Sequence, residues 1–263
     1  MPCMSWYRSD LYQCRGVISQ MTLGVALKTH IERLNPAIGY PTKNATIGDL
    51  FQRESLTPTG YPTIYTEAVT GLGSGAMNAN GTYILTTGAV TGDDVDLRMS
   101  GLALARQSSR TFGSVRTITG TLDYYTIFNL QSAVNHEGFV GLMGNSFSAL
   151  TAIPTTAVHM GVYWDISAQA NFRITSANGT SQVDDDSGIP LDTTARCLHI
   201  RWTGLNTATI ELLDVTNFLP IAATTFSVSA LNSLTQMYPH WFVQTETTAA
   251  RAMATVGWMA KIT

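Results

Sequence analysis

The sequence has little charge, and this shortage excludes one large class of proteins. Charged residues make up 13% of the 263 residues, and the formal net charge is −3. The usual charged share is about a quarter. No basic run stands out among the 15 Lys and Arg residues. Nucleic-acid binding needs a clustered positive face that neutralises phosphates, so we expect no nucleic-acid partner.

Cysteine is also scarce, since the three cysteines are too few for a disulfide framework. Cys197 lies in an alternating pattern and is expected to act as a small hydrophobe in the core. Cys3 and Cys14 could pair with each other, but free thiols in a reducing cytoplasm are the favoured interpretation. No signal peptide is visible, and no apolar run reaches membrane-spanning length. We therefore expect assembly in a cytoplasm and no membrane partner.

Apolar residues make up 44% of the chain, which is enough for a core. With so few charges, the surface must be covered by Thr, Ser, Asn and Gly. This composition is typical of Thr-rich β-domains, of extracellular β-proteins, and of virion proteins that pack against their neighbours.

Short stretches rich in β-branched and aromatic residues follow one another from about residue 61 to the C-terminus. Polar turns such as Asn178-Gly179 separate them. The expected strands lie at 63–66, 82–86, 95–99, 115–130, 138–143, 158–165, 171–175, 197–202, 209–214, 226–228, 240–245 and 254–262. Many short strands with regular turn signals predict an all-β fold, an antiparallel β-sandwich or jelly roll.

Residues 1–58 differ from the rest. Apolar residues at roughly helical spacing predict one helix over 17–34, and Asn35-Pro36 would end it. Proline and glycine then punctuate an irregular stretch. We predict two parts: an extended, partly helical N-terminal arm over 1–58 that serves assembly or anchoring, and a sandwich over 59–263. The expected assembly contacts of the arm are Ile18, Met21, Val25 and Ile31.

A series of motifs runs through residues 82–263. They include EGFVGL at 137–142, GVYW at 161–164, FRIT at 172–175, LHIRW at 198–202 and PHWFVQT at 239–245. In this order they resemble a concanavalin-A-like (lectin/glucanase-type) jelly roll, as found in tailed-phage and related virion proteins. Relatives often carry an acidic residue in the closing strand, where this chain has Gly257.

The glucanase branch of this family implies catalysis by several carboxylates at alternate positions of one strand, and no strand of this sequence offers that set. Glycoside hydrolysis needs two carboxylates about 5 to 9 Å apart across a cleft. Asp165 and Glu211 are the one pair worth naming. We therefore expect no enzymatic activity and no catalytic residues.

Asp184, Asp185 and Asp186 could bind calcium, because hard cations favour carboxylate oxygen. Adjacent residues of a strand point to opposite faces, and further ligands are not evident. We favour a solvated turn and expect no metal or cofactor. The five histidines show no ligand spacing and are interpreted as structural or surface residues.

The lectin branch implies aromatic side chains that stack on sugar rings. Trp202, Trp241 and Trp258 are expected in the core instead. Tyr163 and Trp164 are adjacent and point to opposite faces, so one of them could be exposed and bind glycan.

The resemblance leads to a first hypothesis, a non-enzymatic structural protein of a phage virion. It would be a capsid decoration, cement or fibre component, attached through its arm to the major capsid protein or to tail or fibre proteins. A homo-oligomer is expected, and a trimer would suit this role. The alternative is a carbohydrate-binding, receptor-recognition module of a tail fibre or adhesin. A glycoside hydrolase or lyase is the third hypothesis.

Overall fold

The computed structural model describes residues 45–49, 65–78, 82–99, 103–105, 115–117, 121–144, 157–204, 207–221 and 236–262. In these ranges the regular elements are sixteen β-strands, which form two sheets. No helix in them is long and apolar enough to cross a membrane. The predicted helix over 17–34, the expected arm contacts Ile18, Met21, Val25 and Ile31, the expected strand 226–228, and Cys3 and Cys14 lie outside the described residues.

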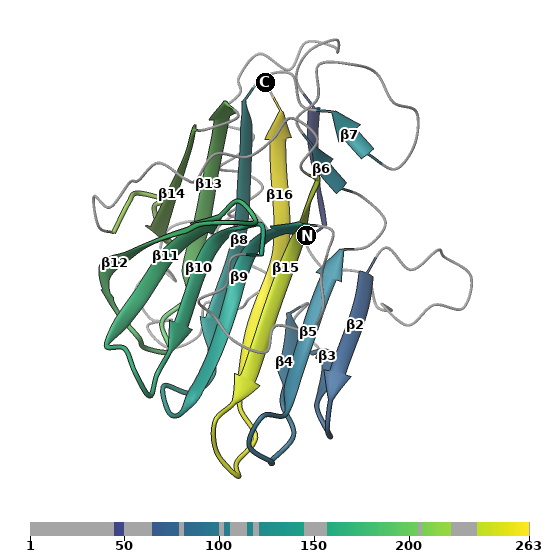
Figure 1. Ribbon diagram of the computed structural model, residues 1–263, viewed down its shortest axis with the longest axis vertical. Helices are drawn as coiled ribbons and strands as arrows, with labels where there is room; N and C mark the ends of the chain where they lie inside the picture. The colour runs from purple at the N-terminus through teal and green to yellow at the C-terminus, as the bar shows by residue number, and fades with distance from the viewer. Residues whose placement is uncertain are drawn as a thin grey trace, which may run out of the picture.

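The first sheet has nine strands (Figure 1). Its main order is β12 (Gln182–Pro190), β11 (Asn171–Ala177), β10 (His159–Asp165), β9 (His136–Gly144), β15 (Gln236–Thr245), β5 (Asp94–Met99) and β2 (Tyr65–Thr70). The short strand β6 (Ala103–Ala105) pairs with β15 beyond the end of β5, and β7 (Val115–Thr117) pairs with β6. The β6–β7 pair is parallel. The main path is antiparallel throughout, as predicted.

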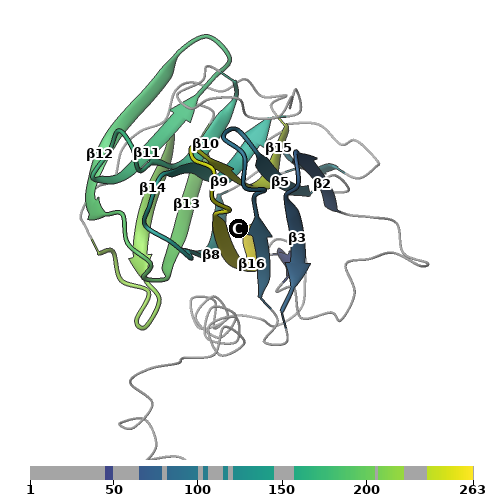
Figure 2. The same cartoon turned by 90° about the horizontal axis from the view of Figure 1, so that it is seen from below.

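The second sheet has seven strands and lies behind the first. Its main order is β14 (Thr207–Asp214), β13 (Arg196–Gly204), β8 (Leu122–Leu130), β16 (Ala252–Ile262), β4 (Tyr83–Thr86) and β3 (Ser74–Met77). Figure 2, seen from below, shows the two sheets as separate layers, with β9, β15 and β5 in one and β13, β8 and β16 in the other.

A seventh strand of the second sheet, β1 (Ala45–Asp49), comes from the segment that the sequence assigned to the arm. It pairs with the last part of β16, from Ala45 opposite Ile262 to Asp49 opposite Trp258. The first part of β16 pairs with β4 on the same edge. Residues 45–49, which the sequence assigned to the arm, therefore form a strand of the sandwich.

The strand pattern follows from alternation of side chains between the two faces of each sheet. In β13, for example, Leu198, Ile200 and Trp202 point into the core between the sheets, whereas His199 and Arg201 point outward. The expected core residues Trp202, Trp241 and Trp258 are at most 1% exposed, which confirms their assignment. Cys197 is fully buried as predicted, but it packs with Tyr125 and Phe218 on the outer face of the seven-stranded sheet.

A hydrogen-bond relay joins the two sheets inside this core. The indole Nε1 of Trp241, on β15, donates to Thr126 Oγ1, on β8, over 3.2 Å. Thr126 Oγ1 in turn donates to the carbonyl oxygen of Gly257, on β16, over 2.7 Å. Gly257 sits at a register shift of β16 with a φ of 127°. A side chain would be strained at this backbone angle, so the closing strand has glycine there.

We predict different effects on stability from two N-terminal deletions. Removing residues 1–44 keeps β1, whereas removing residues 1–58 also deletes β1 and uncovers the edge of β16 from Trp258 to Ile262. The longer deletion should lower the thermal unfolding midpoint by several degrees relative to the shorter one, since about 1 kcal/mol corresponds to about 2–4 °C at this size. Circular dichroism melts of the two truncated chains measure this. Equal midpoints would show that β1 contributes nothing to the sandwich.

Candidate functional site

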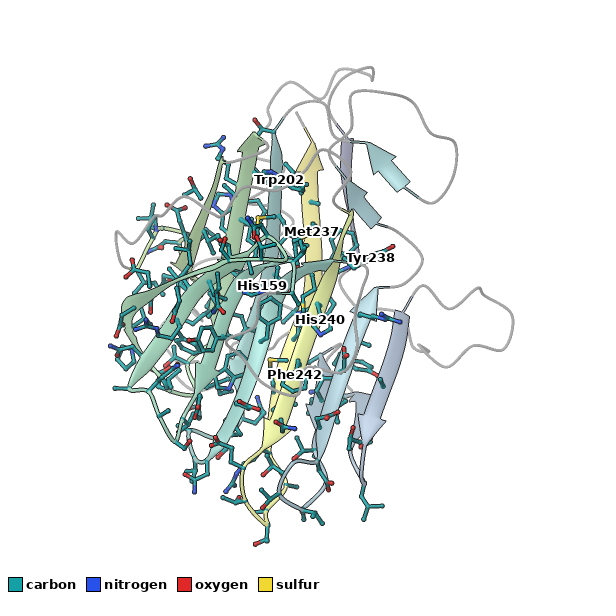
Figure 3. The ribbon with its side chains drawn as sticks, in the orientation of Figure 1. His159, Trp202, Met237, Tyr238, His240 and Phe242 are labelled. Atoms are coloured by element: carbon teal, nitrogen blue, oxygen red, sulfur yellow. The ribbon has the colours of Figure 1, made fainter. Side chains whose placement is uncertain are left out.

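The outer face of the nine-stranded sheet carries a grouping of polar and aromatic side chains, several of which come from the sequence motifs. The register places Asp186, Arg173, Tyr163, Phe139 and Phe242 in one row across five strands, from β12 to β15. His240 lies in the next row, on β15. Figure 3 shows His159, Tyr238, His240 and Phe242 on this sheet.

At the β12 end of the row, Arg173 holds two carboxylates. Its Nε and Nη2 donate to the two oxygens of Asp184 over 2.9 and 3.1 Å, which is a bidentate pair. Its Nη1 lies 3.5 Å from Asp186 Oδ2. The side chains of Arg173, Asp184 and Asp186 are 26%, 28% and 50% exposed, so they are ordered by one another and still reachable from solvent.

Further hydrogen bonds extend this grouping. Asn171 Nδ2 and the backbone N–H of Gly188 donate to Asp186 Oδ1 over 3.0 and 2.8 Å. The Gly188 N–H is the main cause that holds the pKa of Asp186 below its usual value, with Asn171 and Arg173 adding to it. We call the side chains that these bonds connect the β10–β12 network: Tyr163, Gln169, Asn171, Arg173, Asp184 and Asp186.

Tyr163 joins the network from β10. Its hydroxyl donates to Asp184 Oδ2 over 3.0 Å and accepts from Gln169 Nε2 over 3.3 Å. Burial, and then the neighbouring Asp184, raises the pKa of the Tyr163 hydroxyl. The ring itself is 2% exposed, and the adjacent Trp164 is fully buried in the core between the sheets. Neither ring, therefore, has an open face on which a sugar could stack. Tyr163 takes part in the β10–β12 network through its hydroxyl group instead.

The structure corrects the interpretation of the aspartate run as a turn. Asp184, Asp185 and Asp186 lie within strand β12, where Asp184 and Asp186 face outward with Arg173 and Asp185 points to the opposite side. In the part of the chain that the structure describes, no group of three or more His, Cys, Asp or Glu residues is arranged to hold a metal ion.

Beside the network lies a buried patch of aromatic and histidine side chains. Phe139, Met143, Tyr163 and Phe242 form one cluster, with each side chain at most 3% exposed. The Phe139 ring lies 5.7 Å from the His159 ring and 6.0 Å from the His240 ring, centroid to centroid. Sequence reasoning left these histidines without a specific role, since no metal-ligand spacing marks them.

Two glycines explain how this patch fits. Gly141 and Gly161 are direct partners across β9 and β10. A Cβ atom at either position would lie 2.9 Å from the Cζ atom of Phe139, so a side chain there would collide with its ring. Gly141 and Gly161 thus make room for Phe139 on the outer face.

The two buried histidines of the patch have different partners. His240 Nε2 lies 3.0 Å from Asp96 Oδ1, and both side chains are at most 2% exposed. His159 Nε2 contacts Thr175 Oγ1 over 2.9 Å, and its Nδ1 contacts the carbonyl oxygen of Ala157 over 2.6 Å. Burial lowers the pKa of His159 to about 4, so its ring is neutral near pH 7. A carbonyl oxygen can only accept, so Nδ1 carries the proton.

The structure separates the two carboxylates named for hydrolysis. Asp165 ends β10 of the nine-stranded sheet, whereas Glu211 lies on β14 of the seven-stranded sheet. Each faces outward, on opposite sides of the sandwich, because the residues before and after them in the alternation are core residues. These two groups cannot flank one glycosidic bond.

Asp165 instead joins two other carboxyl groups at the turn end of the nine-stranded sheet. It is the direct cross-strand partner of Glu137, and Ser167 Oγ lies 2.7 Å from Asp165 Oδ1 and 2.8 Å from Glu246 Oε1. Burial, followed by the charges of Asp165 and Glu246, raises the pKa of Glu137 to about 7. The sequence did not reveal this grouping, because Glu137 lies on β9, Asp165 ends β10 and Glu246 follows β15.

No family model matches the chain, and no curated protein matches it. Solved structures share its fold. The peanut lectin structure with a 9mer peptide aligns with a TM-score of 0.53 and 11% identity over 84% of this chain and 98% of the lectin. The CBM2 module of the evolved Dit of Lactobacillus casei BL23 phage J-1 aligns with a TM-score of 0.53 and 13% identity, over 85% of this chain and 97% of the module.

A glycosyl hydrolase family protein from Mycobacterium fortuitum aligns as well, with a TM-score of 0.51 and 10% identity over 81% of this chain and 98% of that protein. At these identities the likeness shows the fold alone. The chain has the lectin-like, concanavalin-type β-sandwich that its motifs predicted.

Glu137→Gln should change how stability depends on pH. The folded protein keeps a proton on Glu137 up to about pH 7, whereas a free carboxyl releases it near 4.5. The free energy of unfolding therefore falls as the pH rises through this window. At pH 8 the variant should be more stable by about 1–2 kcal/mol, allowing for solvent screening of a partly exposed group.

Urea unfolding of both proteins at pH 4 and pH 8 measures this difference. The two curves should nearly coincide at pH 4. Asp185→Asn, which removes an exposed carboxylate from β12, is the control and should not reproduce the gain. A variant that is less stable than the parent at pH 8 would show that the ionised Glu137 carboxylate does not destabilise the folded protein.

Proposed function

We propose that this protein is a non-enzymatic carbohydrate-recognition module of a phage particle, and that it binds sugar through the β10–β12 network. The observation that carries the proposal is a half-exposed set of interlocked Arg, Asp, Asn, Gln and Tyr groups on one face of a lectin-like sandwich. This combines the alternative of the sequence analysis, a receptor-recognition module, with its first hypothesis, a virion component.

The chemistry of the network suits a polyhydroxylated ligand. Arg173, Asn171 and Gln169 supply N–H donors, and Asp184 and Asp186 supply acceptor oxygens, within one patch. Because these groups already fix one another, binding would cost little side-chain entropy. A site built from buried or ordered hydrogen-bonding groups also discriminates strongly against ligands that lack the matching hydroxyls.

Two further observations support the proposal. The carboxylates named for hydrolysis, Asp165 and Glu211, lie on opposite sides of the sandwich, which favours binding over turnover. The solved structures with this fold include a carbohydrate-binding module from a phage Dit protein and a plant lectin. Fold likeness is an analogy, so the network residues rather than the fold are the object of the test.

Asp186→Ala should weaken glycan binding at least tenfold. The substitution removes an acceptor that Asn171, Arg173 and Gly188 hold in place, and a hydrogen bond to a charged group contributes about 1.5–3 kcal/mol. Bacterial cell-wall polysaccharides on an array, followed by calorimetry on any ligand found, measure the effect. Asp185→Ala is the matched control, because it removes the same charge from the same strand on the opposite side.

Two outcomes would overturn the proposal. The intact chain could bind no polysaccharide of the panel, or Asp186→Ala could bind as tightly as the parent while remaining folded. Turnover of a polysaccharide by the intact chain would favour the hydrolase or lyase hypothesis instead.

The second candidate function is attachment to the particle through the N-terminal arm, which would make the chain a decoration, cement or fibre component. It is favoured by the fold likeness to a module of a phage Dit protein. The expected contacts Ile18, Met21, Val25 and Ile31 all precede β1, and the partners would be the major capsid protein or tail or fibre proteins.

Deleting residues 1–44 should abolish incorporation into particles and leave β1 in place. Because β1 belongs to the sandwich, this deletion tests the arm and keeps β1, which a deletion of 1–58 would remove. Western blots of purified particles measure incorporation, and light scattering of the free chain tests the expected homo-oligomer. Normal incorporation of the truncated chain would contradict the arm hypothesis.

A further inference from the structure

The outer face of the seven-stranded sheet carries a histidine with a carboxylate on each side. His199, on β13, places its Nε2 3.0 Å from Asp123 Oδ1, on β8, and its Nδ1 3.1 Å from Glu211 Oε2, on β14. The register sets His199 directly opposite Glu211 on one side and Tyr125 on the other. One imidazole ring therefore connects three neighbouring strands.

The geometry of this contact determines how many protons it holds. A neutral imidazole has one N–H donor and one bare nitrogen, and an ionised carboxylate only accepts. A bare nitrogen 3 Å from a carboxylate oxygen would be repelled, so both nitrogens must carry protons or one carboxyl must be protonated. In either case His199, Asp123 and Glu211 together hold one more proton than they would with a neutral ring and two ionised carboxylates.

The surroundings stabilise a positive ring in particular. The ring of Tyr125 stacks on His199 with a centroid distance of 4.4 Å and an interplanar angle of 6°. An aromatic face of this kind attracts a cation. Burial alone lowers the pKa of His199, but hydrogen bonds and charges from Asp123 and Glu211 together outweigh it and raise the pKa above the usual value.

A further charged group lies at this site. Arg201, on the same strand as His199, lies 3.3 Å from Asp123 Oδ1 through its Nε and is 56% exposed. This cation compensates Asp123, so the link to Glu211 is the part of the arrangement that depends on the charge of His199.

We propose that protonated His199 links β14, at the edge of the seven-stranded sheet, to β13 and β8 at neutral pH. As the pH rises and the ring loses its proton, this edge loosens. Among the described residues, β14 has one neighbouring strand in the sheet, β13. The contact between Glu211 and His199 adds a side-chain link from β14, and His199 also contacts Asp123 on β8. A loosened edge strand presents unpaired backbone groups to other chains.

The state of the ring can be read directly in the intact chain by long-range nitrogen–proton NMR. His199→Gln identifies the His199 signals among the five histidines. We expect both ring nitrogens of His199 to be protonated at pH 6.5, with a titration midpoint above this ordinary value. Glu211→Gln should lower this midpoint by about one pH unit. Asp214→Asn, which removes a charge from the same strand without touching the ring, should leave it unchanged.

Hydrogen exchange tests the release of the edge. After correction for the intrinsic rate, protection of the β14 amides that bond to β13 should fall up to tenfold per pH unit above the midpoint, because one proton is linked to opening. Protection of β8 amides should not follow. In His199→Gln the pH dependence in β14 should disappear. These local readouts are needed because Glu137, on the other sheet, also titrates near pH 7.

Two results would overturn the proposed role of His199. One is a neutral His199 ring at pH 6.5 in the intact chain, which NMR decides even if Glu211→Gln fails to fold. The other is β14 protection that stays constant from pH 6 to pH 9 in a chain whose His199 has lost its proton.

Discussion

The packing of two sheets on a shared aromatic core is the constraint on which the rest of this structure depends. Trp164 of one sheet stacks against Phe128 of the other with a centroid distance of 6.0 Å and an interplanar angle of 7°. The relay from Trp241 through Thr126 to Gly257 fixes the sheets by directional bonds inside the same core. Because hydrogen bonds are directional, this relay also restricts how β15 lies over β8 and β16.

Once the inner faces are committed to the core, function must reside on the outer faces and turns. The two outer faces have different chemistry. The nine-stranded sheet combines the half-exposed β10–β12 network with a buried patch around Phe139, whereas the seven-stranded sheet combines the His199 site with an apolar cluster around Cys197 and Phe218. Alternation in the strands separates these outward groups from the core tryptophans.

Two histidines show how strongly the surroundings of a side chain change its pKa in this molecule. His159 and His199 are both buried on outer sheet faces, yet burial drives the pKa of the first to about 4 and two carboxylates drive that of the second upward. In the sequence, both are single histidines in alternating strands. The difference arises from the residues opposite each ring on neighbouring strands, and those neighbours are set by the register.

The sequence by itself determined the all-β fold class and most of the strands, because alternation, turn residues and β-branched content act locally. It did not predict the short strands β3 and β6. It also identified Trp202, Trp241 and Trp258 as core residues, since large aromatic side chains in alternating strands are best placed between sheets. The same local reasoning placed Asp184 to Asp186 in a turn, and it did not show that residues 45–49 join the sheet.

Only the tertiary structure decided which residues act together. It placed Asp165 and Glu211 on opposite sides of the sandwich, buried both Tyr163 and Trp164, and brought Arg173 against two aspartates of the next strand. The physical reason is that cross-strand neighbours come from chain segments with very different separations. His199 and Glu211 are 12 residues apart, whereas His199 and Asp123 are 76 apart. Spacing along one strand carries no information about such partners, because sheet order and register assign them.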